Sequence, residues 1–351
     1  MPYRFKINEP VEKGFRRIAL EQLDASLAEL AGPQVGAKNV HECRKSLKRL
    51  RSLVRLAADA IGHGKAVRRT KSLGEIAQLL SARRDQTVML ETIGKLSHDI
   101  SGAAAALQPL KDRLLARMPN APETLEAEIA EQARKSLLQE AKKFARVKFN
   151  KRGFAGLAGG LEASYRQGRK ASKYAYEEPT DENFHDLRKA VQWHWRQMSL
   201  LSKAWPDEFA VRVHAARELS QTLGDDHDLA VLVAAASAAE GMTEEQKNAA
   251  VSVCRAQQEI LRATAEYRAK RLFAEKPEAF VSRVATYWRC SRSLDPRLEV
   301  QAPPSHVAGS DEAAPVAAES PAPAPTEKRP VPAKPRLATK SEGPAASQRR
   351  A

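Results

Sequence analysis

One short motif occurs twice in this chain, and it constrains the fold more than any other feature. His41-Glu-Cys-Arg44-Lys45 is matched by His185-Asp-Leu-Arg188-Lys189, which begins 144 positions later. An aspartate follows each copy at nearly the same distance, since Asp85 lies 44 residues after His41 and Asp228 lies 43 residues after His185. A repeat with this spacing predicts two related halves, each presenting a cationic helix face.

Between Pro10 and about Arg289 the sequence is typical of α-helices. Ala, Leu, Glu, Arg, Lys and Gln dominate, apolar residues recur at steps of three and four, and alternating β-branched runs are scarce. Breaks predict four or five helices before residue 150 and as many after it, at Gly32-Pro33, Gly62 to Gly64, Pro119, Pro122, Pro179, Pro206, Gly241 and Pro277. The stretch from Gly153 to Gly160 fits either a connection between halves or a close helix contact. We predict an all-α fold of helical hairpins stacked into two bundles, residues 1–150 and 151–290.

The composition changes near the end of the chain. Eleven of the 20 prolines lie beyond Asp295, mixed with Ala, Ser, Lys and Glu and with almost no large apolar residue. Such a segment buries too little surface to offset its conformational entropy. We therefore predict that residues 291–351 form a disordered Pro/Ala-rich tail after a folded domain at 1–290.

The chain of 351 residues carries a formal charge of +15. The segment from Asp295 onward has eight Lys/Arg and seven Asp/Glu, so +14 belongs to the part predicted to fold. This excess attracts polyanions, which include nucleic acid, acidic lipid headgroups and phosphate polymers. Three scattered cysteines imply no disulfide framework, and Cys43 is expected to be a buried thiol. With no signal peptide and no membrane-length apolar stretch, we expect a cytoplasmic protein.

The helix of the first motif copy separates apolar residues from basic ones. One arc holds its predicted buried side, made of Val40, Cys43, Leu47, Leu50, Val54, Ala57 and Ile61. A cationic row runs beside this arc with one residue about every 5 Å, and it consists of His41, Arg44, Lys48, Arg51 and Arg55, with Lys45 towards solvent. Like charges at these spacings repel, so a bound polyanion would stabilise the row.

The second copy keeps the motif and then diverges. Its predicted buried arc contains Phe184, Leu187, Val191, Met198 and Leu201, and the opposite side contains His185, Lys189, Arg196 and Lys203, with Arg188 at the flank. Gln192, Trp193 and Trp195 replace cations of the first copy, so the second surface should be weaker and more aromatic. A histidine at the start of each helix can donate hydrogen bonds to phosphate oxygens beside Arg and Lys.

Five further basic clusters either extend this surface or only keep the chain soluble. They lie at residues 65–71, 83–84, 142–143, 148–152 and 165–173.

Several of these elements resemble the CHAD family, the conserved-histidine α-helical domains. The resemblance covers about residues 3 to 290, and it rests on His41-x-x-Arg44-Lys45-x-x-Lys48-Arg49-x-Arg51, on Leu80 to Asp85, on His185-x-x-Arg188-Lys189 and on Leu223 to Asp228. It implies two four-helix bundles related by a pseudo-twofold axis, a basic central groove that binds inorganic polyphosphate, and placement at polyphosphate granules. It also implies a stand-alone member, because the Glu-x-Glu-x-Lys motif of fused triphosphatase domains is absent from this N-terminus.

Three functions compete at this stage. The first is non-catalytic polyphosphate binding, without metal or cofactor, by His41, Arg44, Lys45, Lys48, Arg51, Arg55, His185, Arg188, Lys189 and Arg196. The second is a nucleic-acid-binding protein, which the low aromatic content of 5% and the lack of interleaved stacking residues disfavour. The third is a metal-dependent phosphohydrolase built on Asp225-Asp226-His227-Asp228. Against it, Arg84 occupies the position of His227 in the first half, and Asp85 and Asp228 are expected to cap or pack helices near an arginine.

The polyphosphate hypothesis makes one quantitative prediction from the sequence. Arg44→Ala combined with Arg188→Ala should weaken polyphosphate binding by roughly tenfold or more, because two charge-assisted contacts are lost. The melting temperature should remain nearly unchanged.

Overall fold

The structure is a computed structural model that describes residues 3–32, 34–80, 85–117 and 124–294. All of these residues belong to one compact unit, Met1–Ser320. Within these ranges the chain forms helices and no strand, apart from an isolated bridge between Gly36 and Thr124. The predicted all-α class is confirmed. The predicted disordered tail lies outside the described residues from position 295 onward.

The first half contains more helices than the sequence predicted. Seven are described before residue 150, and they are α1 (Val11–Glu29), α2 (Ala37–Leu56), α3 (Ala58–Ile61), α4 (His63–Leu79), α5 (Asp85–Asp99), α6 (Ala103–Ala116) and α7 (Ala127–Ala145). Two of the breaks are single glycines with positive φ, Gly62 at 91° and Gly102 at 80°. Glycine adopts this conformation without steric cost, so one residue is enough to end a helix and start the next.

The second half follows the predicted breaks. Its helices are α8 (Ala155–Glu177), α9 (Asp181–Leu201), α10 (Pro206–Ser237), α11 (Glu244–Leu272) and α12 (Pro277–Ser293), with a 3-10 turn η1 (Ser202–Ala204) after α9. Pro206 and Pro277 each occupy the first turn of a helix, where the missing N–H costs nothing. Helix α12 extends three residues past the predicted domain end at 290.

The order of helices repeats between the halves. Helices α1 and α2 begin 144 positions before α8 and α9, and α4 begins 143 positions before α10. Asp85, the first residue of α5, corresponds to Asp228 inside α10, so α10 spans what α4 and α5 cover in the first half. The repeat is thus present at the level of secondary structure. A pseudo-twofold axis between two bundles stays a prediction.

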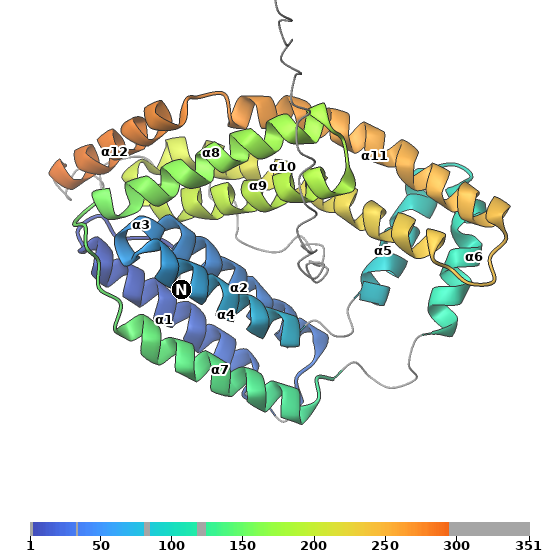
Figure 1. The fold of residues 1–351 in the computed structure, drawn as a ribbon, viewed down its shortest axis with the longest axis horizontal. Helices are drawn as coiled ribbons and strands as arrows, with labels where there is room; N and C mark the ends of the chain where they lie inside the picture. Colours follow the sequence, from blue (N-terminus) through green and yellow to red (C-terminus); the bar gives the residue numbers. More distant parts are fainter. Residues whose placement is uncertain (1–2, 33, 81–84, 118–123, 295–351) are drawn as a thin grey trace, which may run out of the picture. The chain divides into compact units, whose positions relative to one another are not determined.

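Two hydrophobic cores hold these helices together (Figure 1). The larger core includes α1, α2, α4 and α7, which pack on one another, and continues into α8, α9, α10, α11 and α12. The smaller core joins α5 and α6 to the C-terminal part of α10 and the N-terminal part of α11, through Leu107, Leu232 and Cys254 among others. The α5–α6 pair therefore packs against helices of the second half.

Helix α8 approaches α2 closely enough to require glycine. A Cβ atom at Gly160 would overlap the carbonyl oxygen of Leu56 and would lie 2.5 Å from that of Arg55. Gly153, with φ of 59°, lies in the connection just before α8. The glycine-rich stretch therefore serves both purposes considered for it, a connection at its start and a helix contact at its end.

In the part of the chain that the structure describes, no helix has the length and apolar character needed to cross a bilayer.

Candidate polyanion-binding site

The two helices that carry the repeated motif, α2 and α9, pack against each other (Figure 1). The hydroxyl of Ser52 donates a hydrogen bond to the carbonyl oxygen of Trp193 at 3.4 Å. The guanidinium carbon of Arg55 lies 3.5 Å from the centroid of the Trp193 ring. Two segments 144 positions apart in the repeat thus meet in one place.

The predicted apolar arcs of both helices are confirmed. Every residue assigned to them is buried, from Val40 to Ile61 on the first helix and from Phe184 to Leu201 on the second. Three basic site residues are buried as well: Arg44, Arg188 and Arg196 are 9%, 2% and 7% exposed. Arg196, predicted on the side of α9 opposite its apolar arc, is buried because α9 also packs against α2, α8 and α10.

The C-terminal part of α2 holds two guanidinium groups side by side. Neither Arg51 nor Arg55 forms an ion pair with a carboxylate of the described residues. Burial, and then the charge of Arg51, lower the pKa of Arg55 to about 10. Arg55 therefore stays protonated at neutral pH, but its cation is held where solvent stabilises it poorly and a like charge repels it. An anion placed between the two groups would offset both costs.

Neighbouring helices fix the position of Arg55. Its Nη1 donates to Oε1 of Gln167 on α8 at 3.0 Å, and its guanidinium covers the face of Trp193 on α9. A cation over an indole ring is stabilised by the ring quadrupole. Trp195 has the guanidinium of Arg196 at 5.2 Å from its ring centroid. The two tryptophans that replace cations of the first copy thus support arginines.

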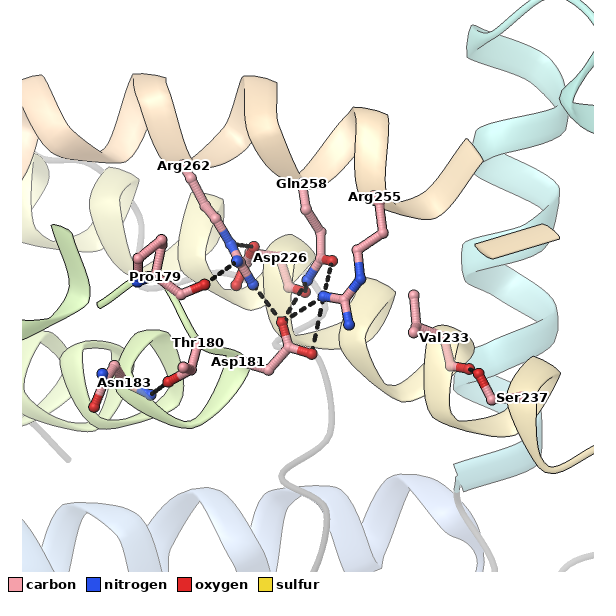
Figure 2. A network of polar contacts seen from close by, with 10 residues as sticks. All are labelled: Pro179, Thr180, Asp181, Asn183, Asp226, Val233, Ser237, Arg255, Gln258 and Arg262. Carbon is pink, nitrogen blue, oxygen red and sulfur yellow. Dashed lines mark hydrogen bonds and ion pairs between the residues drawn. The ribbon is translucent and has the colours of Figure 1, made fainter. Parts of the chain in front are cut away.

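A polar network anchors the first turn of α9 to α10 and α11 (Figure 2). The Thr180 hydroxyl accepts from the backbone N–H of Asn183, which caps the helix. The Asp181 carboxylate lies 2.7 Å from Nη1 of Arg255 and 2.5 Å from Nη2 of Arg262. Nε of Arg262 lies 2.7 Å from Oδ1 of Asp226 on α10. The network fixes where the histidine of the second motif copy meets α10.

His185 lies against His227 of α10, with ring centroids 4.7 Å apart and an interplanar angle of 35°. Both imidazoles are half-buried. Two neighbouring imidazoles at a basic surface can supply N–H donors to an anion.

Asp228 connects the basic residues of three helices. Burial raises the pKa of its carboxyl to about 7; the charges of Arg188, Lys95 and Lys48 act in the opposite direction, and Asp225 reinforces the rise. Burial also raises the pKa of Asp225, against the charges of Lys95 and Arg188. The charges of cations from α2, α5 and α9 therefore all act on one buried carboxyl group of α10.

Some of this arrangement was not visible in the sequence. Lys95 belongs to no repeat and no motif, and it reaches the site because α5 packs on α10. Of the two roles expected for Asp228, capping or packing a helix, its buried position in the interior of α10 excludes capping and fits packing. The expected proximity of Asp228 to an arginine is met by Arg188. The side chain of Asp85 lies outside the described residues.

The remaining predicted site residues have local roles. Lys45 lies 3.2 Å from Glu42, and Lys189 lies 2.5 Å from Asp186, each about one turn away on the same helix. Arg44 donates to the carbonyl oxygen of Ala77 on α4 at 3.1 Å. His41 is half-buried in the first turns of α2.

The acidic run in α10 does not converge on one point. Asp226 is turned towards Arg262 of α11, whereas Asp225 and Asp228 lie near Arg188 and Lys95. Among the residues that the structure describes, no group of three or more His, Cys, Asp or Glu side chains is placed to hold a metal ion. Arg84, the first-half counterpart of His227, lies outside them.

Comparison with known proteins identifies the family. Among solved structures the fold is similar to that of PptA from Streptomyces chartreusis, with a TM-score of 0.53 and 15% identity over 76% of this chain and 100% of that chain. At this identity the likeness shows the fold alone. No curated protein matches the chain. The sequence profile of the CHAD domain matches residues 17–237, which include both copies of the motif, and the chain therefore belongs to the CHAD domain family.

Proposed function

We propose that this protein binds inorganic polyphosphate, without catalysing a reaction, in a basic groove where α2 and α9 meet. Membership of the CHAD family is consistent with this ligand. The observation that carries the proposal is the pair Arg51 and Arg55, two partly buried guanidinium groups held together at the contact between the repeat helices without a carboxylate partner.

The chemistry of the ligand suits this arrangement. Polyphosphate is a flexible chain with a negative charge on each unit, and the basic row of α2 from His41 to Arg55 extends about 20 Å along the helix axis. Successive phosphoryl groups can therefore contact successive cations. Arginine offers paired N–H donors to phosphate oxygens, and lysine offers a point charge. Neutralising several phosphates releases counterions, so the affinity should fall steeply with salt.

The ten predicted ligands divide by burial. We assign direct contacts to Arg51, Arg55 and Lys48, and to the imidazoles of His41 and His185. Lys45 and Lys189 are half-exposed and would contact the polymer at the rim. Arg44, Arg188 and Arg196 are buried, and they would contribute mainly to the positive potential of the groove.

This division changes the test that the sequence suggested. Replacing Arg44 and Arg188 by alanine would remove buried side chains, so a lower melting temperature would accompany any loss of binding. Arg51→Gln combined with Arg55→Gln is sharper, because no ion pair is broken and the relieved repulsion offsets the lost contacts of Arg55 with Gln167 and Trp193. We expect the affinity for long-chain polyphosphate to fall by roughly tenfold or more while the melting temperature does not fall.

The matched control removes the same charge elsewhere. Lys135 and Lys270 are 70% and 69% exposed and pair only with glutamates of their own helices. Lys135→Gln combined with Lys270→Gln should leave the affinity within about twofold of the wild type, as expected for weak exposed pairs. Equal affinities of the two double variants would contradict the proposed site.

Two observations favour this function over its competitors. The rings of Trp193 and Trp195 carry guanidinium groups, so they are poorly placed to stack on nucleic-acid bases. Competition between polyphosphate and single-stranded DNA at matched salt tests this, and equal displacement by DNA would leave the polyphosphate assignment unsupported.

The divergence of Asp226 from Asp225 and Asp228 disfavours a metal-dependent hydrolase. Release of phosphate from polyphosphate on addition of Mg²⁺ or Mn²⁺ would contradict a non-catalytic role.

The proposed domain organisation follows the sequence, with a CHAD domain at 1–290, halves at about 1–150 and 151–290, and a tail at 291–351. A protein with this function should accumulate where the polymer does. Imaging of the tagged chain with a polyphosphate stain, with and without the polymer's synthase, checks its placement at granules.

A further inference from the structure

A second basic surface forms at one end of the helices α4 and α7, which pack side by side (Figure 1). Nη2 of Arg69, near the start of α4, donates to the carbonyl oxygen of Lys143, near the end of α7, at 2.9 Å. The backbone N–H of Asn150 donates to the carbonyl oxygen of Ala60 at 3.0 Å. The basic clusters at 65–71 and 142–152, far apart in the sequence, thus meet at one end of the first half.

This surface has a large excess of positive charge. Residues 59–71 and 140–152 contain ten Lys/Arg and two carboxylates, Asp59 and Glu140. Both carboxylates are already paired, Glu140 with Lys143 at 2.7 Å and Asp59 with Lys151 at 2.6 Å. We define the basic end surface as the six exposed cations that form no ion pair with a described carboxylate: Lys65, Arg68, Lys142, Arg146, Lys148 and Arg152.

The start of α10, which is the second-half counterpart of the start of α4, is neutralised. Glu275, in the connection between α11 and α12, lies 2.5 Å from Arg212 of α10 and 2.6 Å from Arg283 of α12. Glu208 lies 3.0 Å from Arg283 as well. Arg212, which lies 144 positions after Arg68, is therefore paired with carboxylates, whereas Arg68 forms no ion pair with a described carboxylate. Solubility alone does not require such a difference, since mixed charges are equally well solvated.

We propose that the basic end surface is a second contact for the same polyphosphate chain, so that a long polymer occupies it together with the α2–α9 site. This inference rests on the proposed function. The chain connects the two surfaces over a short path. Asp59 lies four residues after Arg55 and pairs with Lys151 at 2.6 Å, and Lys151 directly precedes Arg152 of the end surface.

Occupying both surfaces makes the affinity depend on polymer length. Once one part of a long chain is bound at α2 and α9, its contact with the end surface is intramolecular and has a high effective concentration. A short oligophosphate cannot reach both surfaces. The number of counterions released on binding should also rise with length until both surfaces are covered.

The test neutralises the end surface alone, with Lys65→Gln, Arg68→Gln, Lys142→Gln and Arg146→Gln in one chain. These side chains are exposed and break no described ion pair, so the fold should be retained. We expect the affinity for long-chain polyphosphate to fall by roughly tenfold or more, with a shallower dependence on salt. The affinity for tripolyphosphate should stay unchanged. A control with the same loss of charge replaces Lys135, Lys173, Lys270 and Lys276 by glutamine and should bind both ligands like the wild type.

The outcomes separate this inference from the proposed function. If the end-surface variant binds long-chain polyphosphate like the wild type, the inference is wrong and the proposed function stands. If it loses affinity for both ligands equally, the surface is not a separate contact and the inference is again wrong. If it keeps polymer binding and loses binding to phosphatidylglycerol vesicles, the surface serves a membrane instead. If the wild type binds neither polyphosphate ligand, the proposed function fails and the inference fails with it.

Discussion

The helices α2 and α9 carry the same motif but present different amounts of charge. Arg51 and Arg55 of α2 are partly accessible and have no carboxylate partner. On α9, Arg188 and Arg196 are buried, and Lys189 is paired with Asp186. The two halves differ in the same direction at the starts of α4 and α10. The proposed function therefore assigns most ligand contacts to the first half and mainly a positioning role to the second half.

The largest effect is expected from removing a buried cation of the supporting helix. Arg188→Ala removes the positive charge that acts most strongly on the buried carboxyl of Asp228 and one of the two that act on Asp225. Breaking a buried charge pair in this way should lower the free energy of unfolding by about 3 kcal/mol. Urea unfolding of the Arg188→Ala and Arg51→Gln variants compares how much a cation of α9 and a cation of α2 contribute to the free energy of unfolding. A stable Arg188→Ala variant would show that α9 has no such supporting role.

A direct comparison of the two helices comes next. Arg51→Gln with Arg55→Gln should weaken polyphosphate binding by roughly tenfold more than Lys189→Gln with His185→Gln, because the former pair has no competing carboxylate. Isothermal titration of both double variants at one salt concentration measures this. If the α9 variant loses as much affinity as the α2 variant, the halves contribute equally and the comparison above is wrong.

The sequence predicted what depends on local periodicity and missed what depends on packing partners. The buried arcs of α2 and α9 were correct because a 3.6-residue period defines one face of each helix. The burial of Arg196 was missed because it requires knowing that α9 has neighbours on several sides. Lys95 was missed because only tertiary packing brings α5 to α10. The helix count of the first half was too low because a single glycine such as Gly102 is a weak signal for a break.

A smaller effect is expected from pH, through the carboxyl of Asp228. Its pKa is raised to about 7, so the group is mostly neutral below this pH and charged above it. The carboxylate offsets the charges of Lys48 and Arg188, so polyphosphate affinity should fall as pH rises through 7. The raised pKa also means that burial of Asp228 costs folding stability above pH 7 and not below its unfolded pKa.

Asp228→Asn tests this dependence. At pH 8 the variant should bind polyphosphate about threefold more tightly than the wild type, as expected for one partly screened charge, and at pH 6 the two should agree. His185 and His227 are present in both proteins, so the difference between them isolates Asp228. Asp186→Asn, which removes an exposed carboxylate of α9, is the control. If the affinities of the wild type and Asp228→Asn change with pH in the same way, the carboxyl of Asp228 is not the cause of the pH dependence.

An effect of similar size concerns the contact by which α9 positions a cation of α2. Trp193→Leu removes the ring beneath Arg55 but keeps an apolar side chain against the core. Loss of a cation–π contact of about 0.5–1 kcal/mol should weaken polyphosphate binding two- to fivefold. Trp193→Phe retains an aromatic ring, so its affinity for polyphosphate should lie between those of the wild type and Trp193→Leu. In the Arg55→Gln background the guanidinium is already gone, so Trp193→Leu should then change the affinity no further. If Trp193→Leu still weakens polyphosphate binding two- to fivefold in the Arg55→Gln background, Trp193 contributes to binding independently of Arg55. Helix α9 would then contact the ligand itself.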